Sequence, residues 1–281
     1  MNISDKMDII IEQAKLHIYE FDIHKRFFFE ERNRKFPFYV LSYMKEGSSK
    51  VSLNGKDYQG GEHSIYLIPP NVLHDHVKDN DDLTVFMWWH FNFLLADSID
   101  ILKMFNLPVH FNMPKYHLKF ENLFSEYVEL SHQKNKIYGI IRRRSKALEL
   151  MSVIIEAAMN NIGEQNLNIN YCSDFTSILT DIISEPEENI TLTELADEYH
   201  MHPTYISNRF KKLFGVSPIQ LRNEIRIKKS KNLLITANKK IGEIAYELGF
   251  NDSDHLTHYF KKQTGMSPSE FRKLNLKEIS I

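Results

Sequence analysis

Two pairs of adjacent lysines stand in the same sequence context near the end of this chain. The first copy, Phe210-Lys211-Lys212-x-x-Gly215-x-Ser217-Pro218-x-x-x-Arg222, returns fifty residues later as Phe260-Lys261-Lys262-x-x-Gly265-x-Ser267-Pro268-x-x-x-Arg272. Lysine ammonium groups attract phosphate oxygens, so paired lysines at matched positions are suited to binding a polyanion. A repeat of this length indicates a duplicated supersecondary unit.

The basic residues are concentrated in the same part of the chain. The whole sequence has 35 Lys and Arg against 37 Asp and Glu, which gives a net charge of −2. Residues 201–277 alone carry 15 Lys and Arg against 6 Asp and Glu. Such asymmetry within one chain indicates a nucleic-acid partner for the basic part.

Each repeated phrase lies at the end of a predicted pair of helices. In the first copy Thr191 and Thr193 precede an acidic helix start, and Pro203 suits the first position of the next helix. The second copy predicts helices over 241–248 and 253–263. Two helices around a short turn form a helix-turn-helix, whose second helix enters the major groove of DNA.

The two copies differ in their turns, and a connecting helix joins them. Ala196 precedes Phe210 by 14 residues and Ala245 precedes Phe260 by 15, so the second turn holds one more residue. The connecting segment predicts a helix with one solvated, basic side, formed by Arg226, Lys228, Lys229 and Lys231. A rigid connection would place the two units in successive major-groove segments about 34 Å apart. We expect the phosphates to be held by helix N-termini and by four lysines: Lys211, Lys212, Lys261 and Lys262.

The second copy carries a more specific pattern. Ala245-x-x-x-Gly249-Phe250-x-Asp252, followed by the repeated phrase, resembles the signature of AraC/XylS-type bacterial transcription regulators, and the resemblance covers residues 173–281. It implies base contacts at Thr204, Ser207 and Asn208 in the first unit and at Ser253, Asp254 and His258 in the second.

Asn208 and His258 depart from that family pattern because they occupy positions where Arg is common. Arg209 is a substitute for the missing Arg if the helix turns slightly. Asp254 should repel phosphate. We therefore expect the first unit, which has no acid on its DNA-facing side, to dominate specificity.

The preceding sequence predicts a different fold. Short strand patterns between Phe27 and Phe93 alternate with turn signals such as Asn54-Gly55, which is typical of a small antiparallel barrel or sandwich. Helical periodicity follows over 116–134 and 138–160, and these helices pack on the barrel or form a dimer contact. An Asn-rich segment, 161–172, predicts a linker. The expected architecture is α+β with two domains, 1–160 and 173–281.

Gly47, Gly60-Gly61, Pro69-Pro70 and His74 resemble the cupin β-barrel that such regulators use as a sensor. The resemblance implies a small-molecule effector inside the barrel. Strand alternation directs Trp88 and Trp89 to opposite faces, so only one of them can line the pocket. We expect Trp88 to stack on a sugar, with polar contacts from Tyr43, His76 and His90.

Three alternatives stay open. His74-Asp75-His76 has the spacing of a metal-binding pair in cupin enzymes, but the Glu expected a few residues later is absent. A cupin-type metal-binding protein or enzyme fused to a DNA-binding domain is therefore a second hypothesis, although no Ser-His-Asp pattern or Gly-rich phosphate loop occurs. A regulator controlled by a partner protein is a third, and an architectural DNA-binding protein would not need the strands. We expect no cofactor, no metal and no catalysis.

The remaining features concern the compartment and the partners. The sequence starts without a signal-peptide pattern, has no apolar run of about 18 residues, and contains one cysteine, Cys172, which together predict a cytoplasmic protein. The prediction is a homodimeric regulator of transcription, expected to be an activator. Its predicted partners are double-stranded promoter DNA, a small-molecule effector and RNA polymerase.

Overall fold

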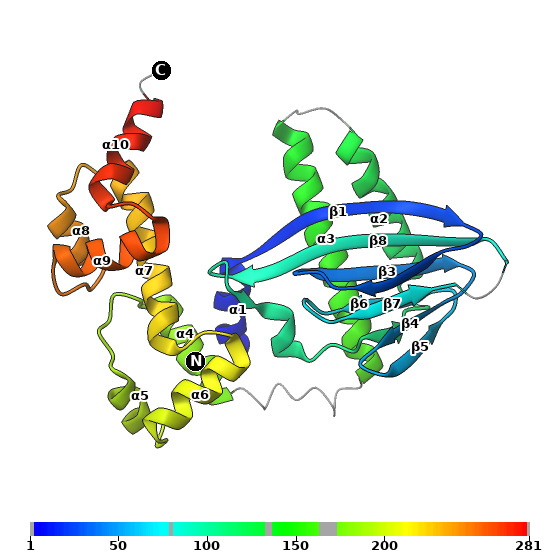
Figure 1. Cartoon of the computed structure of the whole chain (residues 1–281), viewed down its shortest axis with the longest axis horizontal. Helices are drawn as coiled ribbons and strands as arrows, with labels where there is room; N and C mark the ends of the chain where they lie inside the picture. The colour runs from blue at the N-terminus through cyan, green and yellow to red at the C-terminus, as the bar shows by residue number, and fades with distance from the viewer. Residues whose placement is uncertain (1–2, 79–80, 133–136, 163–172, 280–281) are drawn as a thin grey trace. The chain divides into compact units, whose positions relative to one another are not determined.

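The computed structural model describes residues 3–78, 81–132, 137–162 and 173–279 (Figure 1). Its internal contacts divide the chain into two compact units. We call residues 15–94 and 101–169 the sensor unit, and residues 1–14, 95–100 and 170–281 the helical unit. Most of the expected linker, 163–172, lies outside the described residues.

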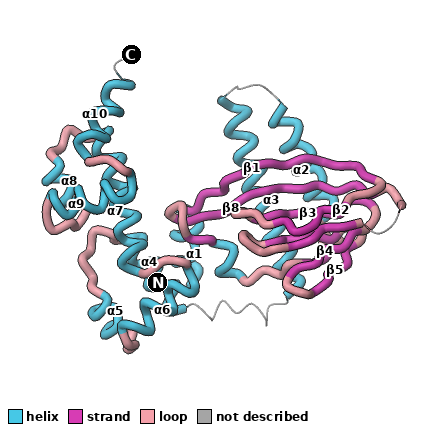
Figure 2. Tube along the Cα trace, in the orientation of Figure 1, coloured by secondary structure: helices cyan, strands magenta, loops and turns pink. Residues whose placement is uncertain are grey.

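The sensor unit is built on two sheets (Figure 2). The larger sheet has the order β1-β8-β3-β6-β10, and the smaller has the order β2-β7-β4-β5. The strands are β1 (Ala14–Arg26), β2 (Glu30–Arg34), β3 (Tyr39–Glu46), β4 (Ser49–Leu53), β5 (Lys56–Gly60), β6 (Ser64–Ile68), β7 (His74–Val77), β8 (Thr84–Leu95) and β10 (His110–Asn112). The predicted Asn54-Gly55 hairpin joins β4 to β5, and both turn residues have positive φ.

Register determines what each face of the larger sheet contacts. In the antiparallel β3–β8 pair, Ser42 lies opposite Trp88, and Tyr43 lies opposite Met87 on the other face. Trp89 lies on that second face, where its ring packs against Tyr127 at 6.2 Å between centroids. Tyr127 belongs to α2 (His117–His132), which packs with α3 (Ile137–Ile162). One face of the sheet thus packs on a helix, and the other faces the inside of the barrel.

The helical unit contains the two predicted helix-turn-helix units. α5 (Leu192–Glu198) and α6 (Pro203–Phe214) form the first, and α8 (Ile241–Glu247) and α9 (Ser253–Thr264) form the second. α7 (Pro218–Thr236) runs between them (Figure 1). The unit also contains α4 (Ser173–Ser184) and α10 (Pro268–Ile279). Gly215 and Gly265 end α6 and α9 in the left-handed conformation, which glycine adopts without a Cβ penalty.

Two pieces of distant sequence complete the helical unit, and neither was predicted. α1 (Ile3–Gln13) packs against α4, where Lys6 Nζ donates to Ser177 Oγ at 2.5 Å. The segment 95–100, which holds β9 (Ile99–Asp100), contacts α7 through an Asp97–Lys228 ion pair of 2.7 Å. The expected domain boundaries had assigned both pieces to the N-terminal domain. η1 (Ile101–Phe105) follows in the sensor unit.

Within the described residues, no helix combines the length and the apolar character needed to cross a membrane.

Candidate functional site

The outward face of α6 carries the predicted base-contacting residues of the first unit. Ile206 and Phe210 are fully buried, and this fixes the orientation of the helix. Thr204 and Asn208 are exposed on the opposite side, while Ser207 and Arg209 are half-buried. His202 precedes the helix and caps it, because its Nδ1 accepts a hydrogen bond from the Thr204 N–H at 3.3 Å.

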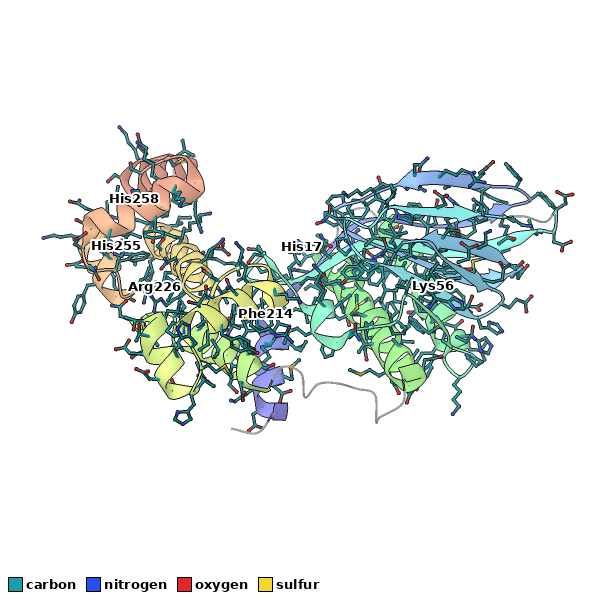
Figure 3. The ribbon with its side chains drawn as sticks, turned by 60° about the horizontal axis from the view of Figure 1, so that its bottom comes forward. His17, Lys56, Phe214, Arg226, His255 and His258 are labelled. Atoms are coloured by element: carbon teal, nitrogen blue, oxygen red, sulfur yellow. The ribbon has the colours of Figure 1, made fainter. Side chains whose placement is uncertain are left out.

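The outward face of α9 is chemically different. Leu256 and Phe260 are buried, and His258 and Asp254 are exposed. Figure 3 shows His255 and His258 on this helix. Ser253 is half-buried beside Asp252, whose carboxylate caps the helix by accepting from the His255 N–H at 2.7 Å.

Thr257 was missed by the sequence prediction. Phe260 corresponds to Phe210 in the repeat, so Thr257 corresponds to Ser207. It is half-buried, as Ser207 is. Counting from the two phenylalanines, instead of comparing the patterns of each helix separately, would have identified it.

The two turns explain the difference of one residue. Each contains a left-handed residue, His200 in the first unit and Gly249 in the second. Each is closed by an equivalent hydrogen bond, from Met201 N to Ala196 O at 2.8 Å and from Phe250 N to Ala245 O at 2.9 Å. The extra residue therefore follows this closure. It is Asn251, which stands before the cap of α9.

The four predicted phosphate-binding lysines share one environment. All are exposed in the last turn of α6 or α9. Cations in the last turn also stabilise the C-terminal end of a helix dipole. The pairs are therefore matched in position and exposure: Lys211 and Lys212 in the first unit, Lys261 and Lys262 in the second.

The repeated arginines at the end of each phrase have a structural role. Arg222 donates to the carbonyl oxygens of Glu188 at 3.2 Å and Ile190 at 2.5 Å, directly before α5. Arg272 donates to the carbonyl oxygen of Leu234, in the last turn of α7, at 3.1 Å and to that of Lys239, directly before α8, at 2.7 Å. Each unit thus fastens the segment that enters its own first helix.

The expectation that Arg226 belongs to a solvated basic side of the connecting helix was wrong. Its side chain is 2% exposed, although its neighbours Lys228 and Lys229 reach the surface. Apolar periodicity cannot reveal this, because a buried arginine and an exposed arginine give the same pattern in the sequence.

A cavity of about 170 Å³ lies inside the sensor unit. Its lining is aromatic and polar, with two acidic and two arginine side chains: Glu20, His24, Arg26, Phe29, Glu31, Arg34, Val40, Ser42, His76, Phe86, Trp88 and His90. Three predicted effector-binding residues are among them, namely His76, Trp88 and His90. The strand that contributes Glu20, His24 and Arg26 was not predicted, because its polar side faces the cavity and weakens the apolar alternation.

Polar atoms without protein partners lie at this cavity. Within the described part of the chain, the buried Trp88 Nε1 and Ser42 Oγ have no hydrogen-bond partner. Ser42 and Trp88 are directly opposite each other on β3 and β8. Buried polar groups are normally hydrogen-bonded, so the unpaired donor and hydroxyl leave two hydrogen-bonding positions open at the cavity.

Two of the three cavity histidines, His76 and His90, are held neutral. Burial lowers the pKa of His76 to about 3, and nearby His74 and Arg34 lower it further. Burial also lowers the pKa of His90 to about 4, although Glu20 opposes the shift. Uncharged imidazoles offer hydrogen bonds without attracting an anion. His76 Nε2 lies 2.9 Å from Ser49 Oγ, which holds the ring in place.

Tyr43 does not line the cavity. It lies on the other face of β3, where its hydroxyl donates to Glu121 Oε1 of α2 at 2.7 Å. Burial and this hydrogen bond raise the pKa of Tyr43. The single-residue alternation of a strand separates Tyr43 from Ser42, and Ser42 takes the place at the cavity that was expected for Tyr43.

The residues of the His74-Asp75-His76 triplet each have a partner within the sensor unit. Asp75 Oδ1 accepts from the Asn33 N–H at 2.7 Å, and His74 Nδ1 lies 3.1 Å from the Val72 carbonyl oxygen. Among the described residues, no group of three His, Cys, Asp or Glu side chains is arranged to hold a metal ion.

Comparison with known proteins finds two family models in this chain. Residues 19–158 match the AraC-like ligand binding domain, and residues 195–274 match a helix-turn-helix domain. The chain is similar to an uncharacterized HTH-type transcriptional regulator, YisR, of Bacillus subtilis, with 24% identity over 86% of this chain and 88% of that protein.

Two further relatives match the chain to different extents. The arabinose operon regulatory protein of Escherichia coli is 24% identical over 87% of this chain and 84% of its own length. The bifunctional transcriptional activator/DNA repair enzyme AdaA of Bacillus subtilis is 33% identical over 38% of this chain and 51% of its own length.

Proposed function

Because this chain belongs to the AraC family of transcription regulators, with a ligand-binding and a DNA-binding domain, we propose that it activates transcription in response to a small uncharged effector, such as a sugar. It acts in the cytoplasm on promoter DNA and recruits RNA polymerase. The observation that carries the effector proposal is the pair of unpaired buried atoms, Trp88 Nε1 and Ser42 Oγ, at one cavity.

The size and charge of the cavity support a small neutral ligand. A cavity of about 170 Å³ is small for a ligand site, so it suits a small metabolite better than a drug-sized molecule or a dinucleotide. The lining includes two carboxylates and two guanidinium groups, so the formal charge of these four side chains is balanced. Trp88 offers a flat ring for stacking. Ser42, His76 and His90 offer hydrogen bonds for hydroxyl groups.

Ligand screening with the full chain tests this proposal. A ligand that binds only the folded state raises its melting temperature by mass action. Neutral pentoses, hexoses and polyols should include a stabilising compound, while the matching uronic acids and amino sugars should not. If only charged compounds stabilise the protein, the chemistry assigned to the cavity is wrong. If no metabolite stabilises it, regulation by a partner protein replaces the effector proposal.

Intrinsic fluorescence localises the binding. The chain has two tryptophans, and Trp89 is fully buried on the opposite face of β8. A ligand at the cavity should therefore change the emission of the wild type but not that of Trp88→Phe. Tyr43→Phe is the matched control, because Tyr43 contacts α2 and should leave the affinity unchanged.

For DNA binding, α6 and α9 are assigned to the major groove. Their outward residues contact bases: Thr204, Ser207, Asn208 and Arg209 in α6, and Ser253, Asp254, Thr257 and His258 in α9. The exposed lysines at the helix ends hold phosphates, which makes the affinity dependent on salt.

Homodimerisation is assigned to α3. Ile137, Ile141 and Leu148 are 79%, 63% and 53% exposed, and their spacing places them on one face of the helix. An exposed apolar stripe of this kind is typical of a protein interface. Ile141→Glu should convert a dimer to a monomer in analytical ultracentrifugation, whereas Lys119→Glu on α2 should not. A monomeric wild type would exclude this assignment.

A further inference from the structure

Arg226 connects three parts of the helical unit. It lies in α7, and its guanidinium donates to the carbonyl oxygens of Pro186, of Glu187 and Glu188 at 3.0 Å each, and of Gly249 at 2.7 Å. It also donates to Asn189 Oδ1 at 3.0 Å. Figure 3 labels Arg226 on α7. The segment 186–189 leads into the first helix-turn-helix unit, and Gly249 forms the turn of the second.

The same two segments touch each other directly. Gly249 has a φ of +72°, and a Cβ at this position would lie 2.0 Å from the carbonyl oxygen of Glu187. Any larger residue would push the two segments apart. The backbone of the second turn is therefore packed against the entrance of the first unit, and Arg226 bonds to both sides of this contact.

The charge of Arg226 makes these contacts strong. Burial lowers the pKa of Arg226 to about 10, as does Arg222, while Glu187 opposes the shift, so the group stays protonated at neutral pH. A buried charge requires full hydrogen bonding, and carbonyl oxygens supply it here. The guanidinium also lies 5.6 Å from the centroid of the Phe250 ring, the residue that follows Gly249.

We infer that Arg226 and Gly249 fix the spacing between α6 and α9. They thereby fix the spacing of the two short DNA sequences that these helices bind, which we call boxes. The inference rests on the proposed docking of both helices in the major groove. α7 packs on helices of both units, and the contact between Gly249 and Glu187, held by Arg226, joins the two units directly beside it. Arg226 is therefore a positioning residue that does not itself contact DNA.

Arg222 provides a matched control on the same helix. It lies one turn before Arg226 and also donates to carbonyl oxygens of the entering segment, at Glu188 and Ile190. These two hydrogen bonds stay within the first unit. A lysine at either position keeps the charge but has no planar fork to hold several carbonyl groups. Arg222→Lys and Arg226→Lys therefore disturb the same segment, and only the second disturbs the link to Gly249.

The experiment first selects the preferred DNA site of the full-length wild type from a random library. Binding is then measured to that site and to variants in which the spacing between the two boxes is shortened or lengthened by up to about three base pairs. A change of about three base pairs rotates one box relative to the other by about a third of a helical turn. The wild type should accept one spacing. Arg226→Lys and Gly249→Ala should lose about tenfold at that spacing and less at the others, so that the spacing profile flattens. Arg222→Lys should keep the wild-type profile.

The outcomes separate the inference from the function on which it rests. A wild type that selects only one box contradicts the docking of both helices. A wild type with a sharp profile, and variants that lose affinity equally at every spacing, would show that Arg226 only stabilises the fold and would overturn the inference.

A distance measurement provides a second test that needs no DNA. Spin labels at Lys211→Cys and Lys261→Cys, in a Cys172→Ser background, report the separation of the ends of α6 and α9. The distribution should be narrow with Arg226 and broad with Arg226→Lys. An equally narrow distribution in both proteins would contradict the inference.

Discussion

The two helix-turn-helix units keep the same framework and differ on the surface assigned to DNA. Both end their second helix at a left-handed glycine after a pair of exposed lysines, and both use an arginine to fasten the segment before their first helix. Asn208 of α6 is replaced by His258 in α9, and Thr204 is replaced by Asp254. The framework and the exposed lysine pairs are alike in the two units, whereas the residues assigned to base contacts differ.

This comparison predicts equal phosphate binding by the two units. Lys211→Ala and Lys261→Ala should each lower the slope of log affinity against log salt by about 0.9, because each lysine neutralises one phosphate. At about 0.15 M salt the double substitution should weaken binding to any duplex by about thirtyfold. Fluorescence anisotropy over a salt series measures both effects. Clearly unequal slopes for the two single variants would contradict the matched roles.

The unequal outward faces predict unequal contributions to specificity. Asn208→Ala should cost about tenfold in affinity for the preferred site, because an asparagine amide can bond to adenine through two hydrogen bonds. His258→Ala should cost about threefold, since a histidine offers one such bond. Competition with unrelated DNA separates this loss from general weakening. A larger loss for His258→Ala would reverse the assignment.

The two helix caps should differ in strength. Asp252→Ala should lower the free energy of unfolding by about 1 kcal/mol, because a carboxylate cap also interacts with the helix dipole. His202→Ala should cost about half as much, since a neutral imidazole accepts a longer bond, 3.3 Å against 2.7 Å. Urea denaturation monitored by circular dichroism compares the two variants. Equal losses would show that the cap residue does not distinguish the units.

The smallest expected effect concerns the acid of the second unit. Asp254 is exposed in the first turn of α9, where it should repel a DNA phosphate. Asp254→Asn should raise the affinity for all duplexes by about twofold at low salt, and the gain should shrink as salt screens the charge. Thr204→Asp should have the opposite effect in the first unit. Unchanged affinity in both variants would place these residues away from the DNA.

The features that were predicted correctly from the sequence are those that local sequence patterns determine. Pro203 acts locally on the backbone, so the start of α6 was predicted correctly. The one-residue alternation of β8 correctly placed Trp88 and Trp89 on opposite faces. For the two helix-turn-helix units the prediction was also supported by repetition, since the same pattern occurs twice in the sequence.

The missed features depend on contacts between distant residues. Arg226 is buried because it meets carbonyl groups 38 to 40 residues earlier and 23 residues later, and its neighbours in the helix do not reveal this. Tyr43 was predicted at the cavity in place of Ser42. Which residues of β3 face the cavity depends on the pairing of β3 with β8, which the sequence of β3 alone does not show. α1 joined the helical unit through α4, which no local pattern indicates.

The most direct test is in vitro selection of bound DNA by three full-length proteins: the wild type, Asn208→Ala and His258→Ala. It tests whether the two units contribute unequally to base specificity. The wild type should select two boxes, one more strongly constrained than the other. Asn208→Ala should relax the strongly constrained box, and His258→Ala should affect only the weaker one. Two equally constrained boxes, or a strong box that depends on His258, would contradict the account.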